Sequence, residues 1–97
     1  MNELQLKSMN EGHWQLVGEM TRNSLGNERL LNQLLQNVQT TLKLDLSEVS
    51  RVDTAGLAWL IHTLSELKKR DCRLELINKP DQLLNLMELG QVSNLFE

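Results

Sequence analysis

Hydrophobic and polar residues alternate in two short stretches at the start of the chain. Leu4 and Leu6 precede the polar run 10–12, and Trp14 and Leu16 follow it. Alternation with a period of two is typical of a strand with one buried face, and a short polar run that contains glycine is typical of a tight turn. The pattern therefore predicts an opening β-hairpin.

Leucines then recur at helical spacing in two longer segments, 30–38 and 57–67, separated from the hairpin by a predicted loop over 18–23. The basic run 68–70 follows the second segment, where positive charges suit the carboxyl end of a helix. The apolar positions are Leu30, Leu31, Leu34, Leu35 and Val38 in the first segment and Leu57, Leu60, Ile61, Leu64 and Leu67 in the second. Both segments are predicted to be amphipathic helices.

A third helix is predicted near the end of the chain. Pro80 is suited to its opening and Gly90 to its end, with Leu83, Leu84 and Met87 as its apolar positions. The residues that follow it, 92–96, are apolar enough to dock on the rest of the domain.

Alternating patterns at 42–46 and 74–76 predict two further strands, and 48–52 carries the chain from the first of them to Asp53. The predicted order is β-β-α-β-α-β-α. Right-handed helical crossovers make the last three strands parallel. Because each strand alternates instead of being apolar throughout, we expect helices on one face of the sheet and water on the other. The fold class is α/β, with a mixed and mostly parallel sheet.

Size and charge narrow the class of protein. The 97 residues are enough for one domain, 1–97, and the net charge of −3 gives no electrostatic support for binding nucleic acid. The apolar runs are too short for a membrane span and the start lacks the pattern of a signal peptide, so we expect a cytoplasmic protein. A single cysteine, Cys72, excludes an internal disulfide and is expected to be a packed thiol. No metal or cofactor is expected.

The pair Asp53-Thr54 lies where a strand runs directly into a helix. Backbone N–H groups at a helix start favour oxygen acceptors, and a phosphate if one is added. This position is therefore predicted to be a contact or switch point, with Thr54 as a candidate for phosphorylation. A simpler alternative stays open, in which Thr54 only caps the helix and Asp53 is a cap or turn former. No histidine or lysine lies at a spacing that would make Thr54 a nucleophile, so no catalytic residue is assigned.

The second helix is predicted to carry a partner-binding face. A helical wheel places Trp59 almost opposite the leucine stripe, with Ala55, His62 and Glu66 on the same side. An exposed tryptophan in a polar rim is typical of an interface anchor. The alternative is that Trp59 folds back onto the first or third helix at the edge of the core. His62 is expected to face solvent or a partner, not to act as a base.

The run Ser-Arg-Val-Asp-Thr-Ala-Gly-Leu-Ala at 50–58, the preceding Leu-Lys-Leu-Asp-Leu-Ser and the earlier Trp-Gln-Leu-Val-Gly-Glu resemble a STAS domain. That is the fold of anti-anti-sigma factors and of the cytoplasmic tails of sulfate transporters. The resemblance spans nearly the whole chain. It implies that Thr54 matches the Ser or Thr that is phosphorylated in anti-anti-sigma factors, that Asp53 matches the Asp before it, and that the helix they open meets the partner.

Within the STAS family, the short chain and its Asp-Thr-Ala-Gly-Leu-Ala run are similar to MlaB-type subunits of Mla phospholipid ABC transporters. This similarity implies a non-catalytic regulator or stabiliser of an MlaF-like ATPase, in a complex with a permease and a periplasmic lipid-binding subunit. It would act in lipid traffic that maintains outer-membrane asymmetry, and would meet the membrane only through that complex. Two alternatives stay open: an anti-anti-sigma factor controlled by a serine kinase through Thr54, and an enzyme or small-ligand binder that uses the helix start as an anion site.

Overall fold

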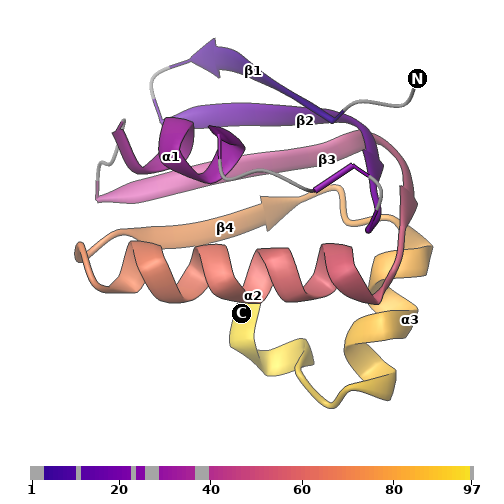
Figure 1. The fold of residues 1–97 in the computed structure, drawn as a ribbon. Helices are drawn as coiled ribbons and strands as arrows, with labels where there is room; N and C mark the ends of the chain where they lie inside the picture. The colour runs from indigo at the N-terminus through magenta and orange to yellow at the C-terminus, as the bar shows by residue number, and fades with distance from the viewer. Residues whose placement is uncertain (1–3, 11, 23, 26–28, 37–39, 97) are drawn as a thin grey trace.

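The fold was analysed in a computed structural model of the chain, which describes residues 4–10, 12–22, 24–25, 29–36 and 40–96. These residues form four strands, three α-helices and one short 3₁₀ helix (Figure 1). In chain order they are β1 (Gln5–Asn10), β2 (His13–Met20), α1 (Arg29–Gln36), β3 (Thr41–Val52), α2 (Thr54–Lys68), β4 (Arg73–Ile77), α3 (Asp81–Leu89) and η1 (Ser93–Phe96).

The strands lie side by side in the order β1-β2-β3-β4. β1 and β2 are antiparallel, with Leu6 opposite Leu16, and this pair is the predicted hairpin. β2 with β3 and β3 with β4 are parallel, as the helical crossovers require. The sheet is therefore mixed and mostly parallel, which confirms the predicted fold class.

The three α-helices pack on one face of this sheet and share one hydrophobic core with it. Leucines of β3, such as Leu44, are fully buried under leucines of α2, such as Leu60. Figure 1 shows α2 running along the sheet beneath β4, with α3 beside the start of α2. This arrangement places the junction between β3 and α2, where Asp53 lies, next to α3.

The opposite face of the sheet is polar, as the alternation predicts. Its centre is Asp45, whose oxygens accept hydrogen bonds from Asn78 Nδ2 at 3.0 Å, Ser47 N at 2.9 Å and Gln15 Nε2 at 3.2 Å. Burial raises the pKa of Asp45, but these hydrogen bonds outweigh it and hold the pKa below the ordinary aspartate value. A single carboxylate thus joins β2, β3 and the end of β4.

Several predicted boundaries differ from the structure. The loop predicted over 18–23 begins too early, because β2 runs to Met20, which is fully buried. The segments 42–46 and 48–52 form one continuous strand, β3. Val38, the last apolar position of the first helical pattern, lies outside the described residues. The third helix begins after Pro80 and ends before Gly90 as predicted.

Candidate partner-binding site

Asp53 is the N-cap of α2 and the point where three segments meet. Its Oδ1 accepts a hydrogen bond from Gly56 N at 3.0 Å, and its Oδ2 accepts one from Arg22 N at 3.0 Å, in the segment after β2. Its own N–H donates to Met20 O at 3.2 Å. The hydrogen bond from Arg22, followed by that from Gly56, lowers the pKa of Asp53, although slight burial opposes the shift. Asp53 is therefore a structural carboxylate with little tendency to take up a proton at neutral pH.

Thr54 is the first residue of α2 and is exposed. Of the two residues that could have capped the helix, the structure assigns the role to Asp53, so the alternative in which Thr54 is the cap is wrong. Within the described part of the chain, the Thr54 hydroxyl makes no hydrogen bond. Because Asp53 occupies the extended position just before the helix, its carboxylate reaches the first-turn amide and leaves the hydroxyl of Thr54 at the surface.

Gly56 allows α2 to start this close to the sheet. A methyl group added at Gly56 would collide with the backbone carbonyl of Met20 and lie 3.0 Å from Cγ1 of Val52. In the sequence, Gly56 drew attention only as part of the STAS-like motif at 50–58. The available signal was a glycine in a helix first turn, which costs about 1 kcal/mol relative to alanine and so suggests a close approach.

Trp59 is half-buried and packs against the core, so the prediction that it is exposed is wrong. α2 contacts α1 and α3 as well as the sheet, and its buried arc is therefore wider than one leucine stripe. Thr63, one turn beyond Trp59 on the same side, is fully buried, and its hydroxyl donates to Trp59 O at 2.8 Å. The edge-of-core alternative describes Trp59 better, and only part of its ring is open to a partner.

The other residues of the predicted face lie as follows. His62 is exposed and Ala55 is half-buried. The Glu66 carboxylate pairs with Lys69 Nζ at 2.9 Å and lies 3.7 Å from Arg70. The hydrogen bond and charge of Lys69, with smaller effects of His62 and Arg70, lower the pKa of Glu66. Glu66 is thus partly engaged within its own helix.

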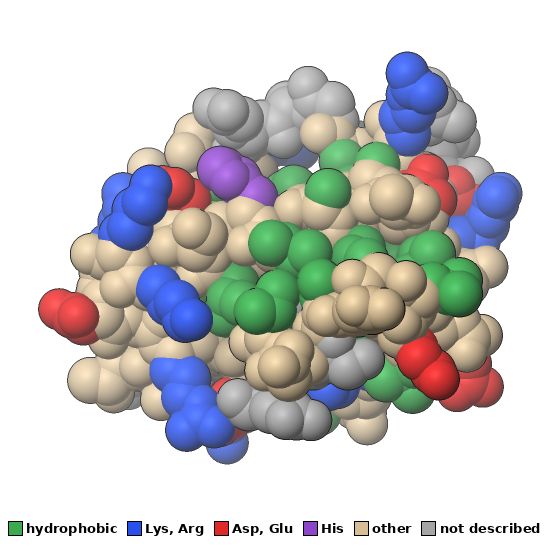
Figure 2. All heavy atoms as spheres, turned by 90° about the horizontal axis from the view of Figure 1, so that it is seen from below, with side chains coloured by type: hydrophobic (Ala, Val, Ile, Leu, Met, Phe, Trp, Pro, Cys, Tyr) green, Lys and Arg blue, Asp and Glu red, His purple; other side chains and the backbone are tan. Residues whose placement is uncertain are grey.

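The helical side of the molecule also carries apolar surface outside α2. Figure 2 shows hydrophobic side chains across the middle of this side, with Lys and Arg side chains around them toward both ends. Leu84 and Leu89 of α3 and Leu95 of η1 are large hydrophobic residues that are exposed. The partner-binding prediction did not include α3.

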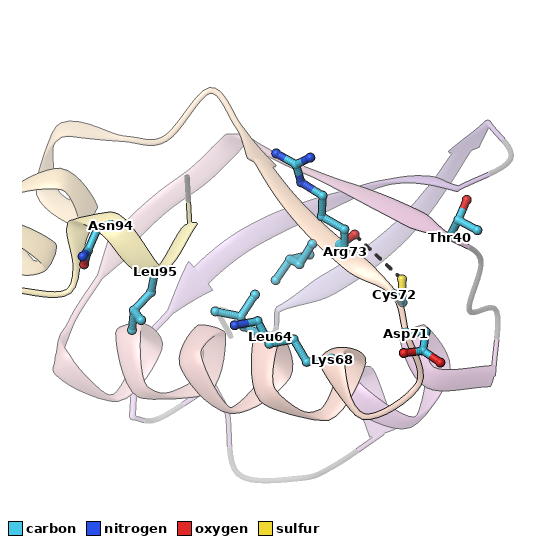
Figure 3. Close-up of a pocket in the computed structure, with 9 residues that line it drawn as sticks. Thr40, Leu64, Lys68, Asp71, Cys72, Arg73, Asn94 and Leu95 are labelled. Atoms are coloured by element: carbon cyan, nitrogen blue, oxygen red, sulfur yellow. Dashed lines mark hydrogen bonds between the residues drawn. The ribbon is translucent and has the colours of Figure 1, made fainter.

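A cavity of about 490 Å³ lies at the opposite end of α2 from Thr54. It is formed between the end of α2, the start of β4 and η1, with Leu64, Cys72 and Leu95 among its lining residues (Figure 3). Cys72 is buried, as predicted for a packed thiol. None of the six predicted partner-binding residues lines this cavity. The cavity is therefore separate from the Asp53–Thr54 site.

The described residues contain no group of His, Cys, Asp and Glu side chains that could hold a metal ion. None of the helices in the same part of the chain has the length and hydropathy that a membrane crossing requires.

Comparison with known proteins identifies the family. Residues 6–97 match the sequence model described as "Mlab, STAS domain". This chain belongs to the MlaB-type STAS domain family. The STAS domain is 34% identical over 56 residues to anti-sigma-B factor antagonists of Listeria monocytogenes and Listeria innocua, which covers 58% of this chain and 49% of each relative. It therefore spans about half the length of the curated relatives it matches.

Two solved structures have the same fold as this STAS domain. The anti-sigma factor antagonist SpoIIAA in its unphosphorylated form gives a TM-score of 0.65 at 18% identity, covering 90% of this chain and 83% of that one. The Bacillus cell fate determinant SpoIIAA in its phosphorylated form gives 0.66 at 17% identity, covering 94% and 86%. At these identities the likeness concerns the fold alone.

Proposed function

We propose that this STAS domain is a non-catalytic subunit that binds and regulates or stabilises the ATPase of a Mla-type phospholipid ABC transporter. The observation that carries the proposal is an exposed Thr54 on a helix start that is held rigidly by Asp53. A rigid surface loses little conformational entropy when a partner binds it. The match to the MlaB-type family model over residues 6–97 supports the choice of partner. In this proposal the domain is cytoplasmic and reaches the inner membrane only through the permease of the complex.

A role in contact, and not in chemistry, follows from the surroundings of Thr54. A hydroxyl nucleophile needs a general base within hydrogen-bond reach. The adjacent carboxylate, Asp53, accepts two backbone hydrogen bonds and has a lowered pKa, so it is a poor base. We therefore expect the isolated domain to turn over no nucleotide.

A second candidate function is that of an anti-sigma factor antagonist controlled by phosphorylation of Thr54. The names of the Listeria relatives and of SpoIIAA support this candidate more directly than they support the transporter. An exposed hydroxyl at a helix N-terminus is also accessible for phosphorylation, and the helix dipole would favour the added phosphate against the opposing charge of the Asp53 carboxylate. In this case the partner would be a serine kinase.

One set of variants tests both candidates. Binding to a Mla-type ATPase subunit, and ATP turnover by that subunit and by the full transporter, are measured with wild-type domain and with the Thr54→Glu variant. Thr40→Glu is the matched control, because Thr40 is also exposed but lies at the far end of α2. The transporter proposal expects binding and altered turnover that Thr54→Glu abolishes and Thr40→Glu leaves intact.

In parallel, the domain is incubated with ATP and an anti-sigma-type serine kinase, and its intact mass is measured. A phosphate on Thr54, combined with no binding to the ATPase, would replace the transporter proposal by the second candidate. ATP turnover by the domain alone that Thr54→Ala abolishes would overturn both and favour an enzyme.

A further inference from the structure

The end of β3 has a strand on one side only. β4 pairs with β3 from Thr41 to Asp45, whereas β3 continues to Val52. Along 46–52, the edge of β3 that faces away from β2 therefore has no strand partner among the described residues. Backbone groups on this stretch need other partners, because an unpaired buried N–H is costly.

The amide of Val52 lies on this open edge. Successive N–H groups of a strand point to opposite edges, and the next one, Asp53 N–H, donates to Met20 O on the β2 side. Val52 N–H therefore points away from β2. It donates to Oε1 of Gln82 at 2.7 Å, which is the short distance of a well-formed hydrogen bond.

Gln82 belongs to the first turn of α3. No side chain caps this helix, since its N-cap is Pro80. Gln82 is exposed as a residue, so its bond to Val52 is not a by-product of core packing. It joins the first turn of α3 to the buried residue that immediately precedes Asp53 and Thr54.

We propose that Gln82 is a positioning residue that fixes α3 relative to the start of α2, so that Thr54 and the exposed face of α3 form one partner-binding surface. The leucines Leu84 and Leu89 are exposed on that helix. This inference rests on the proposed function for its partner, but the bond itself is testable without one. Without the hydrogen bond from Val52 to Gln82, α3 and the Val52–Thr54 backbone sample several relative positions. The apparent affinity for the partner then falls in proportion to the fraction of molecules in the position that binds.

The test compares Gln82→Met, which keeps the length of the side chain but removes the strong acceptor, with Gln82→Glu, which keeps an acceptor. Gln36→Met is the matched control, because it makes the same substitution at an exposed residue of α1, outside the proposed surface, and Gln36 makes no side-chain hydrogen bond with the described residues. Amide hydrogen exchange at Val52 and Thr54 is measured in the full chain, and affinity is measured with the Mla-type ATPase subunit. Thr54→Glu is included in the affinity measurement.

In Gln82→Met we expect exchange at Val52 to accelerate about tenfold and affinity for the ATPase to fall by a similar factor. Gln82→Glu and Gln36→Met should match wild type. Unchanged exchange at Val52 and Thr54 in Gln82→Met would overturn the inference. The inference would also be overturned if Gln82→Met binds the ATPase as tightly as wild type while Thr54→Glu binds it more weakly. If Thr54→Glu also binds normally, the proposed function fails, and the exchange measurement alone decides the role of Gln82. Gln82→Ser, too short to reach Val52, replaces the Met variant if that variant does not fold.

Discussion

Replacing Gly56 by alanine tests whether the start of α2 depends on its close approach to β2. The added methyl group would meet the carbonyl oxygen of Met20, and this oxygen cannot rotate away because it belongs to the backbone and accepts the Asp53 amide. Overpacking of this kind costs about 1–3 kcal/mol. Alanine recovers about 1 kcal/mol through its higher helix propensity. Since the obstacle is backbone, we take the upper end of the cost, which leaves a net loss of about 2 kcal/mol.

For a domain of this size, a loss of about 2 kcal/mol lowers the midpoint of thermal unfolding by about 8–16 °C. Circular dichroism during heating measures it. Gly90→Ala is the control, because its methyl group would lie at ordinary distances of 3.4 Å from Leu86 O and 3.8 Å from Val92 Cγ2. That variant should be as stable as wild type or slightly more so. A Gly56→Ala variant that unfolds at or above the wild-type midpoint would refute the reasoning.

Three further substitutions have expected outcomes. Thr54→Ala should change the free energy of unfolding by less than about 0.5 kcal/mol in urea titrations, because its hydroxyl bonds nothing within the described chain; a larger loss would mean that Thr54 supports the fold. Trp59→Ala should weaken ATPase binding by about 2 kcal/mol in calorimetry, and should also lower the unfolding midpoint because the ring packs on the core; an unchanged midpoint would contradict that packing. Asp53→Ala should cost about 1 kcal/mol at neutral pH. Folding lowers the pKa of Asp53, so the stability that its carboxylate contributes is present above the unfolded pKa near 4 and is lost as the pH falls through the folded pKa. A difference in unfolding free energy between wild type and Asp53→Ala that widens in acid would contradict the role of Asp53 as the cap.

The element order could be predicted from the sequence because the information is local. Alternation around Leu44 and helical spacing around Leu60 each depend on neighbours within a few residues. The junction at Asp53 was visible for the same reason. The end of β2 was not, because Gly18 and the polar residues near it are also typical of a loop, whereas the parallel pairing with β3 continues to Met20.

The details of the site depend on contacts between segments far apart in the chain. The wheel of one helix places Trp59 only relative to the leucines of α2, whereas its exposure depends on the core that α2 forms with the sheet and the other helices. The bonds from Arg22 to Asp53 and from Val52 to Gln82 join residues about 30 positions apart. Nothing in the local pattern of Gln82, an exposed polar residue in a short helix, distinguishes it from its neighbours.

The Asn78 amide that bonds the Asp45 carboxylate lies 33 positions later in the chain, and this separation matters while the protein is being synthesised. A nascent chain that has emerged only as far as α2 already contains the apolar strand β3, but it lacks β4, which covers one edge, and the Asn78 amide that bonds Asp45. An uncovered edge on such a strand is a template for pairing with other chains. The interval in which synthesis leaves the edge of β3 from Thr41 to Asp45 uncovered therefore lasts until β4 and Asn78 have left the ribosome.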